Sequence, residues 1–174
     1  MASEQNVTSF SSLQADTDLV KSKILVLGSA PGILSLKKQQ YYANPRNAFW
    51  WIMAEIFQFQ HALAYNERVA NLTQLGIVVW DVLASCERLG SLDSAINKGS
   101  EIANDVEGLL KLKPTIKVIA CNGQKAYQLL KKHQSLVFDL ECDILSLPST
   151  SPAYAAMSKE KKLEKWKELK QYLH

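Results

Sequence analysis

The sequence predicts an α/β fold, a three-layer α/β/α sandwich around a mainly parallel central sheet of about four strands. Three observations support this prediction. Four short apolar runs have the composition of buried strands, helical stretches separate them, and the length of 174 residues suits one core of this kind. Strands that alternate with helices pair in parallel, because each helix crosses over the sheet between two strands.

The predicted strands are short apolar runs that end in loops. The first ends in a glycine, and the last lies directly before a proline-rich loop. In chain order they span residues 23–28, 76–80, 116–121 and 142–147. Continuous apolar runs of this length are typical of strands that helices cover on both faces.

The predicted helices show apolar residues at helical spacing. One is expected to begin at Pro45, with Asn44 as its N-cap, and others span 67–75, 104–112 and 124–133. A last helix, 158–173, carries an apolar face that should dock on the sheet. Its six lysines favour a solvated face over a grip on DNA.

The two ends of the domain are set by composition. Residues 1–18 are polar and rich in Ser, Gln and Thr, which predicts a flexible N-terminal arm, and residues 19–174 form a single domain. The arm has no apolar core of a signal peptide, and no run approaches the roughly 18 apolar residues of a spanning helix. We therefore expect no membrane association and a cytoplasmic, nucleoid-associated or, in a eukaryote, nuclear location.

Cysteine spacing and charge limit the chemistry. Cys86, Cys121 and Cys142 are isolated from one another, which argues against a zinc or iron–sulfur site, so no metal or cofactor is expected. The net charge is only +3. Between Asp18 and Glu55, however, five positive and no acidic residues occur. This stretch is either a solvated face by chance or a patch that faces phosphates.

Four segments beside the predicted strand ends carry unusual residues. They are Gly28-Ser-Ala-Pro-Gly32, Gln40-Tyr-Tyr-Ala-Asn-Pro-Arg-Asn-Ala-Phe-Trp50, Cys121-Asn-Gly-Gln-Lys-Ala126 and Leu147-Pro-Ser-Thr-Ser-Pro-Ala153. The first lacks the glycine spacing of a dinucleotide site and the lysine of a P-loop. In the second, Asn44 is expected to cap the helix, so Asn47 calls for another explanation. In such sheets, ligands bind beyond the carboxyl ends of the strands.

Together with Trp80-Asp-Val-Leu-Ala-Ser-Cys86, these segments resemble the uracil-DNA glycosylase superfamily, and most closely its hypoxanthine-DNA glycosylase branch. The likeness covers the chain from about Lys23 to Leu173. It implies a pocket for a base turned out of the helix, hydrolysis of the base–sugar bond without metal, and double-stranded DNA with a damaged or mismatched base as the partner of a monomer.

The resemblance also implies roles for single residues. Asn47 is expected to serve catalysis, and Tyr42 to stack on the extruded base, with Tyr41 and Ala30 beside it. Asn122 is expected to read the base edge or to hold the nearby backbone. The expected DNA contacts are Ser29, Ser149, Thr150, Ser151 and Pro152.

Three positions depart from the pattern of the family. These departures are expected to change the size of the pocket and its preference among bases. Ala30 replaces a water-activating asparagine of the mismatch-specific branch, Cys121 an aromatic, and Tyr154 a smaller polar residue. No carboxylate lies in the first loop, which favours Asn47 as the residue that orients a water molecule. Asp81 is the alternative, although a structural role for it carries more weight.

The predicted function is that of a monofunctional DNA glycosylase in base excision repair, which releases hypoxanthine, with uracil and xanthine as further candidate bases. One alternative is a mismatch-specific uracil or thymine glycosylase of the same fold. Another is a catalytically silent module that binds DNA through a stacking platform. The silent module predicts binding without release of a base.

Overall fold

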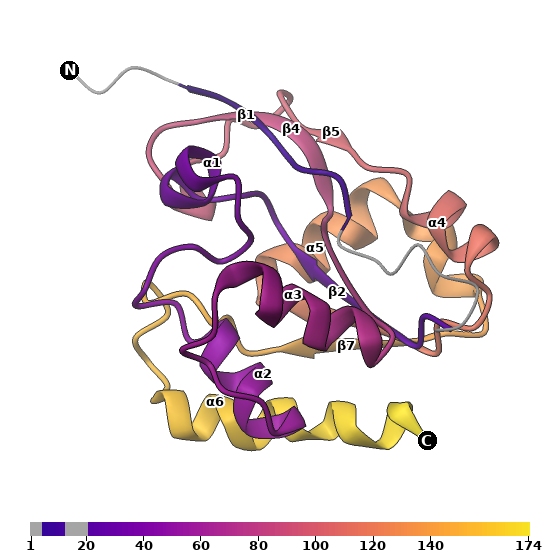
Figure 1. Cartoon of the computed structure of the whole chain (residues 1–174). Coiled ribbons are helices and arrows are strands. Elements are labelled where there is room, and N and C mark those ends of the chain that lie inside the picture. The colour runs from indigo at the N-terminus through magenta and orange to yellow at the C-terminus, as the bar shows by residue number, and fades with distance from the viewer. Residues whose placement is uncertain (1–4, 13–20) are drawn as a thin grey trace.

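The computed structural model describes residues 5–12 and 21–174 (Figure 1). Its central sheet has four parallel strands in the order β3-β2-β6-β7. These strands are β2 (Ile24–Gly28), β3 (Ile77–Asp81), β6 (Val118–Asn122) and β7 (Asp143–Leu147). The four predicted strands and their parallel pairing are therefore confirmed, with shifts of one or two residues at their ends.

Helices cover both faces of this sheet, as predicted (Figure 1). One face packs against α2 (Phe49–Phe57), α3 (Tyr65–Gln74), α6 (Lys159–Trp166) and the 3-10 helix η3 (Lys167–Leu173). The other packs against α4 (Val106–Leu112) and α5 (Gln124–His133). Strand β2 supplies both cores, because Ile24 and Val26 face one way and Leu25 and Leu27 the other.

A second, antiparallel sheet was not expected from the sequence. It has the order β1-β4-β5 and consists of β1 (Gln5–Thr8), β4 (Leu83–Arg88) and β5 (Ile102–Ala103). The prediction of a flexible arm is therefore wrong for residues 5–8, because β1 pairs with β4 and buries Val7 at 1% exposure. Residues 1–4 and 13–18 of the predicted arm lie outside the described residues.

The start of α2 also differs from the prediction. Residues 45–48 form a turn, and the helix begins at Phe49 instead of Pro45. The side chain of Asn44 accepts a hydrogen bond from the Arg46 N–H at 3.0 Å and so stabilises the turn. The side-chain oxygen of Asn47 accepts from the Phe49 N–H at 3.0 Å. Asn47, and not Asn44, therefore satisfies a free N–H group at the start of α2.

The remaining elements are short. They are α1 (Ile33–Lys38) and the 3-10 helices η1 (Asp93–Ala95) and η2 (Ser135–Asp139). Helix α6 begins after Ser158, which accepts a hydrogen bond from the Lys161 N–H. Trp166 of α6 and Leu169 of η3 are completely buried. Within the described residues, no helix is long and apolar enough to cross a membrane.

Candidate active site

A cavity of about 730 Å³ lies at the carboxyl ends of the central strands. The loops after β2 and β7 reach it, and so do the segment before α2 and residues 91–94. The last residues of β3 and β6, Asp81 and Asn122, also line it. Its lining includes Gly28, Tyr42, Asn47, Asp81, Asn122 and Ser149. The four segments that the sequence singled out therefore meet at one site, which is large enough for a nucleobase and its sugar.

Tyr42 forms one wall of this cavity. Its ring stacks on Phe49, with 4.0 Å between the ring centroids and 26° between the planes. Its backbone has φ of +53°, a conformation that costs energy for a bulky residue and that the surrounding contacts must hold. Because Phe49 covers one face of the ring, the opposite face is the surface on which a base can stack.

Tyr41 has a different environment from its neighbour. Only 3% of its surface is exposed, its ring meets Phe10 edge to face, and its carbonyl accepts a hydrogen bond from the indole of Trp50. Its N–H donates to the hydroxyl of Tyr65. These contacts give Tyr41 a structural role, and because it also lines the cavity, its role in binding the base stays a prediction.

Asn122 and Thr150 hold two loops together. The Asn122 Nδ2 atom donates to Thr150 Oγ1, and Asn122 Oδ1 accepts from the Thr150 N–H, both at 2.9 Å. The Thr150 carbonyl in turn accepts from the N–H of Ala48, next to Asn47. Of the two expected roles of Asn122, the structure shows that it holds the backbone.

The predicted DNA contacts differ in accessibility. Thr150 is 1% exposed and its hydroxyl is used inside the protein, so a DNA contact by this side chain does not fit the structure. The Ser29 hydroxyl is also buried and donates to Asp93 at 2.7 Å. Ala30, Ser149, Ser151 and Pro152 are partly exposed on the wall of the cavity.

Asp81, the last residue of β3, places its carboxyl group beside Gly28 of the first loop. It is 3% exposed, and its Oδ2 atom accepts a hydrogen bond from the Ser9 hydroxyl at 2.6 Å. A Cβ atom on Gly28 would lie 2.6 Å from Asp81 Oδ1 and 3.2 Å from the Tyr42 hydroxyl oxygen. Gly28 is therefore the residue that lets this carboxylate and this phenol approach each other.

Burial controls the ionisation of these groups. It raises the pKa of Asp81 to about 7, and the charge of Asp93 adds to the shift, while Ser9 and Arg88 oppose it. Burial and the charge of Asp81 raise the pKa of Tyr42, while the side chain of Asn122 opposes the shift. The site thus contains a neutral phenol and a carboxyl group that changes charge near neutral pH.

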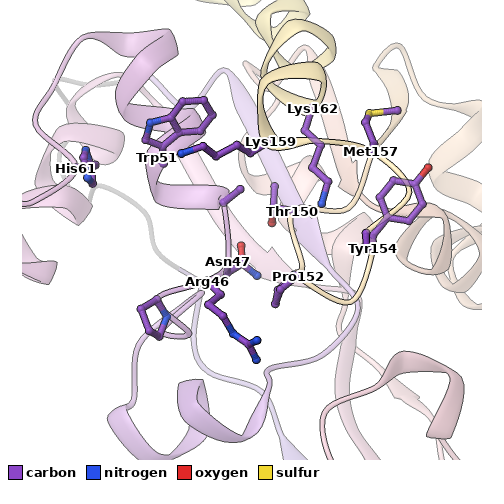
Figure 2. Close-up of a pocket in the computed structure, with 13 residues that line it drawn as sticks. Arg46, Asn47, Trp51, His61, Thr150, Pro152, Tyr154, Met157, Lys159 and Lys162 are labelled. Carbon is purple, nitrogen blue, oxygen red and sulfur yellow. The ribbon is translucent and has the colours of Figure 1, made fainter.

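A smaller cavity of about 440 Å³ adjoins the first (Figure 2). Arg46, Asn47, Thr150, Pro152 and Tyr154 line both cavities. The walls of the smaller cavity also include residues that only it contacts, among them Trp51, His61, Lys159 and Lys162. Asn47 therefore lies where the two cavities meet.

A family model described as the uracil DNA glycosylase superfamily matches residues 15–174. The chain belongs to this superfamily. A relative from Methanosarcina acetivorans, named hypoxanthine DNA glycosylase, is 36% identical over 144 residues, which are 82% of this chain and 87% of the relative. A second relative with the same name, from Methanosarcina barkeri, is 36% identical over 106 residues, which are 60% of this chain and 66% of that relative.

A solved structure of the same superfamily shares the fold. It is the solution NMR structure of a Methanosarcina acetivorans protein described as a candidate uracil DNA glycosylase. The superposition has a TM-score of 0.79 at 30% identity and covers 97% of this chain and 99% of that chain. The similarity of fold and sequence thus extends over nearly the whole chain, including both cavities.

The larger cavity presents hydrogen-bonding and carboxyl groups, among them the amide of Asn47 and the carboxyl group of Asp81. Among the described residues, no three His, Cys, Asp or Glu side chains form a group that could hold a metal ion. Burial raises the pKa of the Cys121 thiol to about 12, so it is not a nucleophile at neutral pH. Asp81 ends the apolar strand β3 at the edge of the sheet where ligands bind, and this position in the sequence is the signal for its place in the cavity.

Proposed function

We propose that this protein removes hypoxanthine from double-stranded DNA and leaves an abasic site, as a monofunctional DNA glycosylase. The observation that supports this most directly is the cavity in which an exposed face of Tyr42, the amide of Asn47 and the carboxyl group of Asp81 come together. The two relatives named hypoxanthine DNA glycosylase support the choice of base.

The first step is extrusion of the damaged nucleotide, which costs a few kcal/mol and costs less at a mismatched pair. In the cavity the base stacks on the face of Tyr42 that Phe49 leaves uncovered. Stacking on an aromatic side chain contributes about 1–3 kcal/mol, which offsets much of the cost of extrusion.

The orientation of Asn47 decides what its amide group can do. Its Oδ1 atom accepts from the Phe49 N–H, so the Nδ2 atom is the part that is free to act in the cavity. This Nδ2 atom donates no hydrogen bond to another described residue. An amide N–H stabilises negative charge but cannot accept a proton from water. Asn47 therefore donates a hydrogen bond to the departing base, where negative charge develops.

Asp81 supplies the acceptor that this arrangement lacks. The N-glycosidic bond breaks with its electron pair on the base, and a water molecule forms a new bond to the C1′ atom of the cation-like sugar. The proton that this water loses passes to the ionised carboxylate of Asp81, whose Oδ1 atom is not used by Ser9. A carboxyl group with a pKa of about 7 suits this role, because it is largely ionised just above neutral pH.

A uracil-specific enzyme of the same fold is the second candidate, and the family model favours it as much as the first. A panel of labelled duplexes with hypoxanthine, uracil, xanthine or thymine opposite each normal base distinguishes them. Alkali cleaves the abasic product. Cleavage fastest with hypoxanthine supports the proposal, cleavage of uracil or thymine duplexes alone supports the second candidate, and binding without cleavage indicates a silent module.

A further inference from the structure

The smaller cavity beside Asn47 has an unusual charge balance (Figure 2). Three of its lining residues are Arg46, Lys159 and Lys162, and the described lining contains no Asp or Glu. A concave wall that carries charge of one sign concentrates the electric potential in the cavity. The cavity should therefore attract an anion.

Lys162 is the positively charged residue of this cavity whose environment most clearly favours an anion as its partner. Only 4% of this residue is exposed, although lysine is almost never buried without an ion pair. Its Nζ atom donates to the Ser151 carbonyl at 3.1 Å and lies 5.2 Å from the ring centre of Tyr154. No ion pair of Lys162 occurs within residues 5–12 and 21–174. Burial lowers its pKa, so the charged form is held at a cost.

The groups around Lys162 extend the same environment. The Nζ atom of Lys159 lies 4.5 Å from the ring centre of Trp51, and the figure shows both side chains on the wall of the cavity (Figure 2). The prediction of a solvated lysine face on the last helix is therefore wrong for Lys162 and incomplete for Lys159. Both lie on α6 three residues apart, so they face the same side of the helix.

We propose that the smaller cavity binds a phosphodiester group of the damaged strand next to the extruded nucleotide, with Lys162 as its principal contact. The two cavities share Asn47, Thr150 and Pro152 as walls, so a strand that places its base in the larger cavity carries a neighbouring phosphate to the smaller one. The hydrogen bond from Lys162 to Ser151 couples this phosphate to the loop that borders the base. The proposal rests on DNA as the substrate and not on which base is removed.

The dependence of binding on salt measures this contact. The probe is a fluorescent duplex whose hypoxanthine nucleotide carries a 2′-fluorine, which resists hydrolysis. Lys162→Met keeps the length of the side chain but removes its charge, and Lys170→Met is the matched control, because Lys170 is exposed and lines neither cavity. The logarithm of the association constant falls linearly with the logarithm of the salt concentration. We expect Lys162→Met to reduce the magnitude of this slope by about 0.9, the value for the loss of one phosphate contact. We expect a smaller change in Lys170→Met.

A scan with neutral phosphates locates the contact. Each phosphate that flanks the lesion is replaced in turn by an uncharged methylphosphonate. One position should weaken binding of the wild-type protein about tenfold, in line with the loss of a charged hydrogen bond, and should have no effect on Lys162→Met.

Two results would overturn the proposal. One is a wild-type scan in which no flanking position matters, which needs no variant and holds even if Lys162→Met fails to fold. The other is a folded Lys162→Met protein with the full salt slope and the wild-type scan. Because the readout is binding, either result can be told apart from a failure to release hypoxanthine.

Discussion

Asn47→Asp tests the role of the Asn47 amide with little disturbance of the fold. In the wild-type protein, Asn47 Oδ1 accepts a hydrogen bond from the Phe49 N–H at the start of α2. Aspartate keeps this acceptor, and its charge is favourable at a helix N-terminus. It loses the Nδ2 donor, and it places a negative charge where the base departs as an anion.

The expected effect on the reaction is large. Removal of one donor to a developing anion costs about 10²–10³-fold in rate, or roughly 2.7–4 kcal/mol, and repulsion adds to this loss. The assay is the single-turnover rate on a hypoxanthine duplex at saturating enzyme. The thermal midpoint of Asn47→Asp should stay close to that of the wild-type protein.

Asn47→Ala provides the matched comparison. It removes both the Nδ2 donor and the acceptor for the Phe49 N–H but adds no charge, so it should lose about 10²–10³-fold in rate, and no more than Asn47→Asp loses. It should also be less stable by about 1 kcal/mol, which is a fall of about 2–4 °C in the thermal midpoint. Asn47→Asp with more than a tenth of the wild-type rate, beside an inactive Asn47→Ala, would show that Asn47 acts as an acceptor for water. The reasoning from its orientation would then be refuted.

Four further predictions concern the rest of the site and its chemistry. Tyr42→Ala should weaken binding to the lesion duplex more than binding to undamaged DNA, by up to about 1–3 kcal/mol, whereas Tyr42→Phe keeps the stacking ring and should bind normally. Equal losses of affinity for both DNAs in Tyr42→Ala would make Tyr42 a core residue only. The single-turnover rate of the wild-type protein should fall as the pH drops through about 7, where Asp81 becomes protonated, and Asp81→Asn should abolish this fall. The same fall in the Asp81→Asn protein would assign the pH dependence to another group. Because the pKa of Asp81 is higher in the folded than in the unfolded chain, stability falls as the pH rises from about 4 to 7, so Asp81→Asn should raise the thermal midpoint more at pH 8 than at pH 5. Finally, EDTA should leave the single-turnover rate unchanged, and a loss that a particular metal restores would show that the chemistry depends on that metal.

The central sheet could be predicted from the sequence because its signals are local. An apolar run such as Ile24–Gly28, which has five residues and ends in glycine, is too short for a buried helix and suits a strand that helices cover on both faces. The docking of the C-terminal segment is also a local signal, since the apolar spacing that includes Trp166 and Leu169 continues from α6 into η3, where both side chains are buried. The meeting of the loops followed from the topology, because parallel strands end at the same edge of the sheet.

Features that depend on contacts between distant residues could not be predicted. The strand β1 forms because Gln5–Thr8 pairs with β4, about 80 residues away in the sequence. The polar sequence of β1 does not predict this pairing. The helix start was misplaced because Asn44 and Asn47 are both good capping residues, and the turn at residues 45–48 decides between them. The burial of Lys162 depends on its contact with the loop that contains Ser151. The spacing of apolar residues along the last helix does not predict this contact.

The most direct test of the account is the identification of the released base. A hypoxanthine duplex is incubated with an excess of the protein, and the low-molecular-weight fraction is analysed by mass spectrometry, with the Asn47→Asp protein as the control. The account predicts free hypoxanthine, in a yield equal to the abasic strand, from the wild-type protein and about a hundredfold more slowly or worse from the control. A wild-type protein that binds this duplex but releases no free base would contradict it.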